Sequence, residues 1–162
     1  MIRCGIGYDI HRFAEGRRLM LGGVEIAHPR GLEGHSDADV LSHAIADALL
    51  GALGTGDIGQ HFPNTDESIR GISSLEILKR VAKLLTDKRA RVLSVDATLI
   101  AEAPKIVPHV PEMRQKIADA IRTSDSNVNV KATTNEELGP IGRGEGMAAI
   151  AIATIDITDI GD

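Results

Sequence analysis

The first residues of the chain alternate between apolar and small or polar side chains, and this period of two predicts a β-strand over residues 2–8. The apolar members of the alternation are Ile2, Ile6, Tyr8 and Ile10. A second β pattern follows, in which the short apolar segments 19–21 and 24–26 flank Gly22-Gly23. Two glycines between such segments are typical of the two-residue turn of a β-hairpin. The chain therefore begins with β-structure.

A helical period replaces this alternation after residue 36. Apolar side chains recur three or four positions apart until the pattern stops near Gly54. They are Val40, Leu41, Ala44, Ile45, Ala48, Leu49 and Ala52. We expect Ser36 to cap the start of this helix, with Asp39 three residues later as its capping partner. Residues 54–72 have no clear period and are rich in Gly and Asp, so they are predicted to form a long loop, which is usually functional or disordered.

The rest of the chain alternates helices and strands. Its patterns predict helices over residues 73–87 and 108–121, and strands over residues 92–101, 128–133 and 147–157. The last strand is apolar on both faces, which is typical of a central strand or an oligomer interface. Together the elements predict an α+β fold in a single domain over residues 1–162, with a mixed four-stranded sheet, helices on one face and a small β-hairpin.

Composition narrows the class of protein. The 162 residues suffice for one domain, and with no Trp, one Tyr and two Phe the core must be built from Ile, Leu, Val and Ala. The single cysteine, Cys4, excludes an internal disulfide and is expected to be a small buried strand residue. A net charge of −5 without a basic run argues against nucleic-acid binding. Because no apolar stretch has transmembrane length and the start lacks a signal-peptide pattern, we expect a cytoplasmic protein without membrane contact.

Candidate metal ligands stand near the start of the chain. Asp9 and His11 are two residues apart in the first strand, so both side chains leave it on the same face. His43 lies in the first predicted helix, on what we interpret as its polar face, with Asp39 and Asp47 one turn away on either side. One Asp and two His suit Zn²⁺ with an open fourth position, as in catalytic sites. A simple Asp–His pair is the alternative, and Asp47 is either a carboxylate that supports the site or a solvated charge.

Two segments near these ligands suit a phosphorylated polyol. His35 and Ser36 stand at the predicted helix start, where backbone N–H groups and the helix dipole favour an anion, although a plain cap is the alternative. An anion there would lie near a metal ion on His43, which favours phosphate chemistry. The long loop offers carboxylates and turn backbone that suit hydroxyl groups, unless they are simply solvated. These loop residues are Asp57, Ile58, Gly59, Phe62, Pro63, Asn64, Thr65 and Asp66.

Two further segments follow the ends of predicted strands. Residues 131–136 include two neighbouring hydroxyls and, at their end, a carboxylate. Such a set can bind phosphate oxygens and a hard cation such as Mg²⁺. The alternative is that these residues simply cap a helix. Residues 101–107 bend at a proline and can offer backbone groups to a nucleobase, although such turns are common.

The chain carries, in order, the motifs G-x-G-Y-D-I-H, G-G-V-x-I, G-H-S-D-A-D-V-L-S-H-A, D-A-L-L-G-A, G-D-I-G, F-P-x-T-D, A-P-K, H-x-P-x-M-R, V-N-V-K-A-T-T and G-R-G-E-G. This series covers essentially the whole chain and resembles the 2-C-methyl-D-erythritol 2,4-cyclodiphosphate synthase family of the non-mevalonate isoprenoid pathway. The resemblance implies a lyase that assembles as a homotrimer, with active sites between adjacent subunits.

The resemblance also implies a reaction. The 2-phosphate of 4-diphosphocytidyl-2-C-methyl-D-erythritol 2-phosphate would attack the β-phosphorus of the diphosphate, close an eight-membered ring and expel CMP. The implied ligands of Zn²⁺ are Asp9, His11 and His43. Glu136 would hold a second divalent ion, Mg²⁺ or Mn²⁺, that bridges the α- and β-phosphates. His35 and Thr134 correspond to the residues that stabilise the transition state.

Substrate contacts are implied at further positions. The methylerythritol would meet the loop residues 57–59 and 62–66. The cytidine would lie between Ala101, Glu102, Ala103, Pro104, Lys105, Ile106 and Val107 on one side and Ala132, Thr133 and Thr134 on the other. The remaining contacts are Asp9, His11, His35, Ser36, Asn135, Glu136, Pro140 and Arg143, among which His35, Ser36 and Arg143 would meet phosphate. Asn64 and Pro140 depart from the family, which commonly has Asp and an aromatic residue there.

Two other functions are compatible with the same residues. A zinc phosphohydrolase would use the three ligands to activate water, and only Asp47 is a candidate for the base it needs. A non-catalytic trimer would bind a nucleotide or an isoprenoid, with an axial cavity near Arg143 and Glu145. An isoprenoid diphosphate on the trimer axis is a candidate partner. The products separate these functions, since a hydrolase would release CMP with an open diphosphate and a binding protein would give no turnover.

Overall fold

The computed structural model describes residues 1–63 and 65–158, and its framework is a mixed five-stranded sheet in the order β4-β1-β7-β5-β6. Strand β1 (Ile2–Ala14) pairs antiparallel with β7 (Gly146–Ile157), which in turn pairs antiparallel with β5 (Ala90–Ile100). At one edge β6 (Val128–Thr133) runs parallel to β5, and at the other the short β4 (Gly31–Leu32) pairs with the end of β1. Strand β7 is thus the central strand of the sheet, one of the two alternatives that its apolar faces predict.

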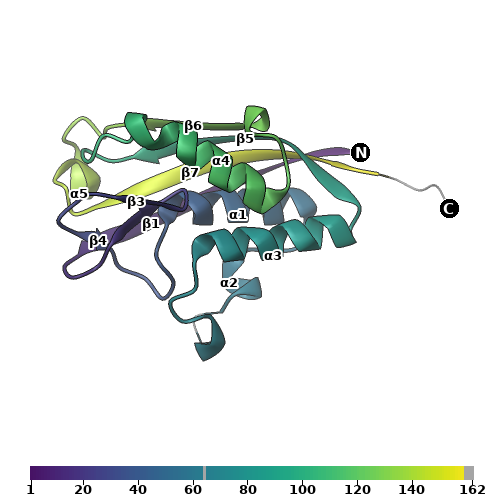
Figure 1. The fold of residues 1–162 in the computed structure, drawn as a ribbon, viewed down its shortest axis with the longest axis horizontal. Coiled ribbons are helices and arrows are strands. Elements are labelled where there is room, and N and C mark those ends of the chain that lie inside the picture. The colour runs from purple at the N-terminus through teal and green to yellow at the C-terminus, as the bar shows by residue number, and fades with distance from the viewer. Residues whose placement is uncertain (64, 159–162) are drawn as a thin grey trace.

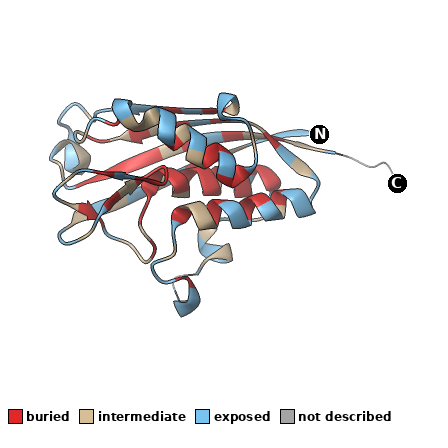
Figure 2. Cartoon of the chain, viewed as in Figure 1, coloured by how far each residue is buried: buried red, intermediate tan, exposed pale blue. Residues whose placement is uncertain are grey.

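Three helices cover one face of this sheet, which confirms the predicted α+β layout (Figure 1). Helix α1 (Val40–Leu53) packs on β1 and β7, and α4 (Val110–Ile121) packs on β6. Helix α3 (Ser74–Asp87) contacts both of these helices. Burial is concentrated in α1 and in the strands beneath it (Figure 2). Helix α1 is therefore the central element of the core.

Two glycines explain why α1 approaches β1 so closely. A Cβ atom on Gly5 would lie 2.1 Å from the carbonyl oxygen of Ala48, and one on Gly7 would lie 2.0 Å from that of Ala44. Such distances leave no space for a side chain, so the helix backbone rests directly on the strand. The contact places the first turn of α1 over the part of β1 that follows Gly7. Asp9 and His11 leave β1 on this same face, because side chains alternate along a strand.

The remaining elements are short. Strands β2 (Leu19–Leu21) and β3 (Val24–Ile26) form the predicted hairpin, with Gly22 and Gly23 at φ 57° and 74°. Those values lie in the left-handed region that a type I′ turn requires. The other short elements are α2 (Ile58–His61), α5 (Gly139–Gly142) and the 3₁₀ turns η1 (Glu67–Ile69), η2 (Val107–His109) and η3 (Asp125–Asn127).

The face of the sheet opposite the helices exposes large apolar side chains. Ile6, Tyr8 and Ile10 on β1 are 64%, 55% and 51% exposed, and Ile152 on β7 is 51% exposed. Ile6 pairs directly with Ile152 across the two strands, so these side chains form one continuous apolar surface. Contiguous apolar surface of this kind is typical of an interaction site. We call these four residues the open face.

The structure corrects several expectations about the elements. The sheet has five strands rather than four, because the two-residue β4 is too short to show a period. Strand β1 continues to Ala14 instead of ending at residue 8. Cys4 is exposed and not buried, since it lies on the same side of β1 as the open face. The predicted loop 54–72 contains α2 and η1.

The start of α1 also differs from the prediction. Asp39 is the N-cap, and its side chain accepts a hydrogen bond from the backbone N–H of Ser42. Ser36 therefore precedes the helix by a full turn. Gly54 closes α1 in the left-handed region and Ser73 caps α3, as the sequence predicts. Other boundaries shift by one or two residues, since β5 begins at Ala90, α4 at Val110 and β7 at Gly146. Among the described residues, each helix falls short of the length and apolarity that crossing a membrane would require.

Candidate metal centre

Three predicted ligands meet at the junction of β1 and α1. The Oδ2 atom of Asp9 lies 2.9 Å from Nε2 of His11 and 3.0 Å from Nδ1 of His43. The two imidazole nitrogens are 3.4 Å apart, and all three ligand atoms lie within 4.8 Å of one another. Each residue is half-buried, so the cluster is accessible from one side. A carboxylate and two imidazoles so arranged form a set that can hold a divalent metal ion.

The electrostatics of the cluster follow from this geometry. Burial acts to raise the pKa of the Asp9 carboxyl, but hydrogen bonds and charge from His11 and His43 outweigh it and hold the pKa well below its usual range. Burial likewise acts to lower the pKa of His11, yet the hydrogen bond and the charge of Asp9 outweigh it and raise that pKa. Asp9 is thus an anion around which the two imidazoles gather.

Asp39 and Asp47 do not form the polar helix face that the sequence predicts around His43. Asp39 is fully buried, and its oxygens accept hydrogen bonds from the backbone N–H groups of Gly22 and Gly23 at 2.9 and 2.7 Å. It therefore joins the hairpin turn to the start of α1. Asp47 accepts a hydrogen bond from the backbone N–H of Ile58 at 2.9 Å, so it holds α2 against α1. Both carboxylates support the scaffold of the site.

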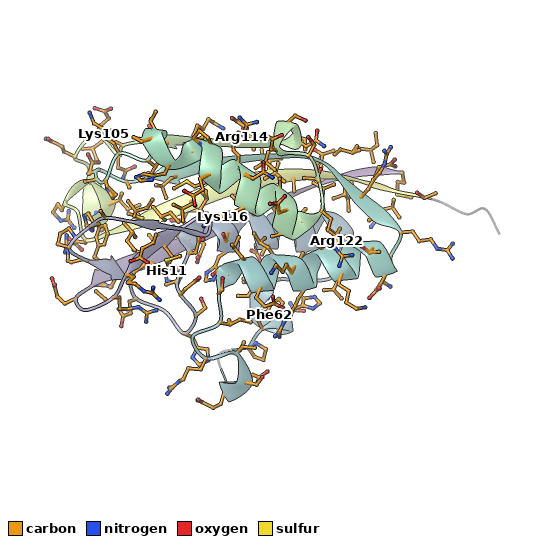
Figure 3. All side chains as sticks on the ribbon, viewed as in Figure 1. His11, Phe62, Lys105, Arg114, Lys116 and Arg122 are labelled. Atoms are coloured by element: carbon orange, nitrogen blue, oxygen red, sulfur yellow. The ribbon has the colours of Figure 1, made fainter. Side chains whose placement is uncertain are left out.

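A cavity of about 250 Å³ opens beside the metal cluster. Its polar wall consists of Asp9, His11, His35, Ser36 and His43, with the backbone of Gly34. Its remaining wall consists of Ile58, Gly59, Phe62, Ile69, Ile72 and Ile77. The structure therefore brings part of the predicted phosphate segment and part of the predicted polyol loop to the metal ligands. His11 and Phe62 are labelled in Figure 3.

The other loop residues take local roles or lie apart. Asp57 caps α2 by accepting a hydrogen bond from the backbone N–H of Gln60 at 2.9 Å, and Asp66 accepts one from Ser68 at 2.9 Å. Pro63 and Thr65 are exposed. The predicted contact at Asn64 lies outside the residues that the structure describes.

Comparison with known proteins gives the chain its family. The sequence profile of the YgbB family matches residues 2–156. The chain belongs to the YgbB family. The sequence motifs resemble those of 2-C-methyl-D-erythritol 2,4-cyclodiphosphate synthases, and relatives of that name confirm this resemblance. The protein from Chlorobium luteolum is 57% identical over 155 residues, which cover 96% of this chain and 99% of that protein. The protein from Thiobacillus denitrificans is also 57% identical, with 96% and 97% covered.

Solved structures agree with this assignment. The Plasmodium falciparum IspF structure, a CDP complex, superposes with a TM-score of 0.84 at 34% identity and covers 98% of this chain and 97% of its own. The bifunctional IspDF from Campylobacter jejuni has a TM-score of 0.93 at 40% identity; the match covers 98% of this chain and 43% of that longer protein. The fold described above is therefore the fold of these family members.

A second group of predicted residues gathers where β5 and β6 end. The two strands are parallel, and the backbone N–H of Ala101 donates to the carbonyl of Thr133 at 3.0 Å. The carboxylate of Glu102 accepts hydrogen bonds from the backbone N–H groups of Asn135 and Glu137 at 2.8 and 3.4 Å. The hydroxyl of Thr134 donates to Glu136 at 3.2 Å. The end of β5 therefore contacts the segment that follows β6, and we call residues 101–107 and 132–136 the strand-end cluster.

Within one chain the strand-end cluster lies apart from the metal ligands. The pairing register places Asp9 opposite Ala149, Ala149 opposite Leu99, and Leu99 opposite Ala132. Three steps between neighbouring strands amount to about 14 Å. Figure 3 likewise shows Lys105 at the β5 and β6 side of the ribbon, away from His11 on β1. One chain thus holds two separate groups of the predicted site residues.

The last predicted contacts lie near α5. Pro140 lines a second cavity with Ile10, His11 and Arg12, and neither Asp9 nor His43 lines this cavity. The exposed guanidinium of Arg143 pairs with Glu145 at 2.8 Å. These two residues form an ion pair on the surface.

Sequence reasoning missed two residues that contact the site. Ser74 lies 2.8 Å from Nε2 of His43, although its position predicts only a helix start. Arg17 donates to the carbonyls of Gly34 and Ser36 at 2.8 and 2.6 Å and so holds the segment that carries His35. Neither residue belongs to a motif with a chemical meaning, and both contacts depend on the folded chain.

Proposed function

We propose that this chain converts 4-diphosphocytidyl-2-C-methyl-D-erythritol 2-phosphate to 2-C-methyl-D-erythritol 2,4-cyclodiphosphate and CMP. The observation that carries this proposal is the cluster of Asp9, His11 and His43 at the wall of a cavity, in a chain that belongs to the YgbB family. The CDP complex of a solved relative supports a cytidine diphosphate ligand.

The donor set fits Zn²⁺, because two imidazoles and one carboxylate leave a fourth position open. When bound there, Zn²⁺ supplies a Lewis acid for a phosphate oxygen. Asp9 holds the imidazoles of His11 and His43 toward that position. We assign a second divalent ion, Mg²⁺ or Mn²⁺, to Glu136, whose carboxylate is exposed and suits a hard cation.

The residues of the chain would act mainly by positioning the substrate and neutralising its charge. Attack of one phosphate on another brings anions together, so donors that stabilise charge matter more than a strong base. His35 and Ser36 line the cavity beside the metal ligands, where they would hold phosphate oxygens. The apolar wall that includes Phe62 and Ile72 would keep water from the reacting phosphorus. Thr134 would contribute a hydroxyl from the strand-end cluster.

We further propose that the chain acts as a homotrimer with active sites between adjacent subunits. The separation of the metal ligands from the strand-end cluster supports this, since both groups must touch one substrate. The open face supports it as well, because a monomer would leave these apolar side chains in water. Each site would combine Asp9, His11 and His43 of one subunit with residues 101–107 and 132–136 of the next.

The remaining predictions from the sequence accompany this proposal. Residues 1–162 are proposed to form a single synthase domain with a cytoplasmic location. An isoprenoid diphosphate on the trimer axis, near Arg143 and Glu145, stays a candidate partner. The zinc phosphohydrolase is the rival enzyme, but its candidate base Asp47 accepts a hydrogen bond from Ile58 instead.

The proposal is tested by following the purified protein with its substrate and Mg²⁺ by ³¹P NMR, with and without a zinc chelator. Two coupled ring phosphorus signals that appear with CMP, and that the chelator suppresses, are expected. Release of CMP without ring signals would favour the hydrolase. Intact substrate in the presence of bound zinc would favour a binding protein.

A further inference from the structure

The imidazole of His43 is held from two sides. Its Nδ1 atom faces Asp9 and His11, at 3.0 and 3.4 Å. Its Nε2 atom faces two hydroxyls, those of Ser74 at 2.8 Å and Ser36 at 3.1 Å. The ring therefore presents Nδ1 to the metal position. For Nδ1 to bind a metal, its lone pair must be free and the proton of a neutral ring must sit on Nε2.

Ser74 is the residue that can impose this arrangement. It is fully buried at the first position of α3, and its hydroxyl lies in close contact with the Oδ1 atom of Asp37. The backbone N–H of Ser74 also donates to Oδ2 of Asp37 at 3.0 Å. The backbone N–H of Asp39 donates to Oδ1 of Asp37 at 3.2 Å. Every one of these contacts brings a donor to Asp37, so its carboxylate acts as the acceptor.

The direction of the hydrogen bonds follows from a count of protons. A serine hydroxyl has one proton to donate, and the carboxylate of Asp37 is the stronger acceptor. Once the hydroxyl of Ser74 donates to Asp37, its oxygen can face His43 only as an acceptor. For the contact between Ser74 and His43 to be a hydrogen bond, Nε2 of His43 carries the proton. Ser36 sets no direction of its own, because its oxygen accepts a hydrogen bond from the backbone N–H of Ala38 at 3.1 Å and its proton is not committed to another acceptor among these contacts.

We propose that Ser74 and Asp37 are positioning residues that fix the tautomer and the orientation of His43, and thereby strengthen metal binding at Nδ1. The chain of contacts runs from the Asp37 carboxylate through the Ser74 hydroxyl and the His43 ring to the metal. Carboxylates that orient an imidazole ligand through its second nitrogen are common around metals, and here a buried serine transmits the effect. The inference rests on the proposed function for the presence of a metal, but it concerns the affinity of the site.

The contact also links two elements of the fold. Ser74 is the first residue of α3, whereas His43 lies in the first turn of α1 and Asp37 precedes it. Neighbouring Ser73 caps α3, because its side-chain oxygen accepts a hydrogen bond from the backbone N–H of Leu75 at 3.3 Å. Ser73 is exposed at the same helix start, so it offers a matched control for Ser74.

The test compares Ser74→Ala with Ser73→Ala and the unaltered chain. Zinc affinity is measured by competition with a chromophoric chelator, without substrate. We expect Ser74→Ala to weaken zinc binding by about 10- to 100-fold, and Ser73→Ala to leave it unchanged within about twofold. In ¹⁵N NMR of the zinc-loaded unaltered chain, His43 should show a proton on Nε2 that exchanges slowly with water. That exchange should become fast in Ser74→Ala.

Two results would overturn the inference. One is a Ser74→Ala variant that melts like the control and binds zinc as tightly as the unaltered chain. The other is a proton on Nδ1 of His43 in the unaltered zinc-loaded chain, a measurement that needs no variant to fold. Failure of the proposed function has a different signature. In that case Ser74→Ala would still weaken zinc binding, while the unaltered chain would give no cyclic product.

Discussion

Asp9 is the residue around which the site is organised, because one of its oxygen atoms contacts both imidazoles. This shared contact couples the protonation of His11 to metal binding. In the metal-free chain the anion stabilises a protonated His11, which is why the pKa of that imidazole is raised. A metal ion competes with that proton for the same nitrogen. The site therefore exchanges a proton for a metal ion.

The exchange predicts opposite pH dependences. Since the pKa of His11 is raised above its ordinary value of 6.5 by folding, its contribution to the free energy of unfolding is complete below pH 6.5. That contribution is lost as the pH rises through the raised value. Zinc affinity should instead increase with pH across the same interval, by about tenfold per pH unit while one proton is displaced. Chemical unfolding of the metal-free chain and zinc titrations in matched buffers measure the two trends.

Asp9→Asn serves as the control for this prediction. The amide keeps the shape of the side chain but carries no charge, so the pKa of His11 should return toward its ordinary value. The decline in stability of the metal-free chain above pH 6.5 should then disappear. A metal-free chain whose stability stays constant across the interval, with Asp9 intact, would contradict the coupling.

At the scale of elements, the close contact of α1 with β1 sets the distance between the ligands. The sequence predicted both elements from their periods, and the spacing of Asp9 and His11 was enough to place them on one face. The helix start was predicted wrongly because Ser36 and Asp39 are both good caps three residues apart. The folded chain selects Asp39, since Gly22 and Gly23 of the distant hairpin donate to its carboxylate.

Contacts that join distant segments explain what else escaped prediction. The hydroxyl of Ser74 reaches His43 only because α3 packs on α1. Strand β4 forms because Gly31 and Leu32 pair with the end of β1. Two residues are too few to show a period, so the sequence pattern does not reveal this strand. Local patterns thus predict periodic elements and ligands that share an element. They contain no information about which side chains a tertiary contact brings to the second nitrogen of a ligand.

Gly7→Ala tests the role of the helix contact. The added Cβ would lie 2.0 Å from the carbonyl oxygen of Ala44, a backbone atom that can move only if α1 moves. We expect a loss of about 1–3 kcal/mol in the free energy of unfolding, from overpacking. Zinc affinity should fall as well, since a displaced α1 carries His43 away from Asp9. Denaturant unfolding and chelator competition measure the two effects.

Gly51→Ala is the control, because Gly51 lies in α1, on the helix side of the same contact with β1. Its Cβ would lie 3.7 Å from the nearest backbone atom, which is an ordinary contact. Alanine has a higher helix propensity than glycine, so the free energy of unfolding of this variant should increase by about 0.5–1 kcal/mol. Its zinc affinity should be unchanged. Equal behaviour of the two variants would show that the space between α1 and β1 does not control the site.

At the scale of the whole molecule, the open face and the separation of the two residue groups have the same explanation in the proposed trimer. A cyclic assembly buries the same surface on every subunit and brings unlike parts of neighbouring chains together. The metal ligands of one chain can then face the strand-end cluster of the next. Assembly and catalysis should accordingly be lost together, whereas zinc binding by a single chain should survive.

Ile152→Asp tests this link through the open face. A carboxylate placed there would be buried without a partner in the assembled protein. This burial costs on the order of several kcal/mol at each interface. We expect the trimer to dissociate into folded monomers that retain zinc and lose turnover by at least about 100-fold. Light scattering, zinc content and CMP release measure the three properties. Lys79→Asp adds the same side chain to the exposed side of α3 and should change none of them.

Mixed trimers give the sharpest test of a site shared between chains. His43→Ala removes a metal ligand, and Glu136→Gln removes the proposed ligand of the second ion, so each variant alone should be inactive. When the two are unfolded together and refolded in equal amounts, some interfaces combine an intact His43 from one chain with an intact Glu136 from its neighbour. In a random cyclic assembly about one quarter of the sites are of this kind. Recovery of about one quarter of the unaltered activity is therefore expected, whereas a site within one chain would give no recovery, because every chain in the mixture carries one of the two defects.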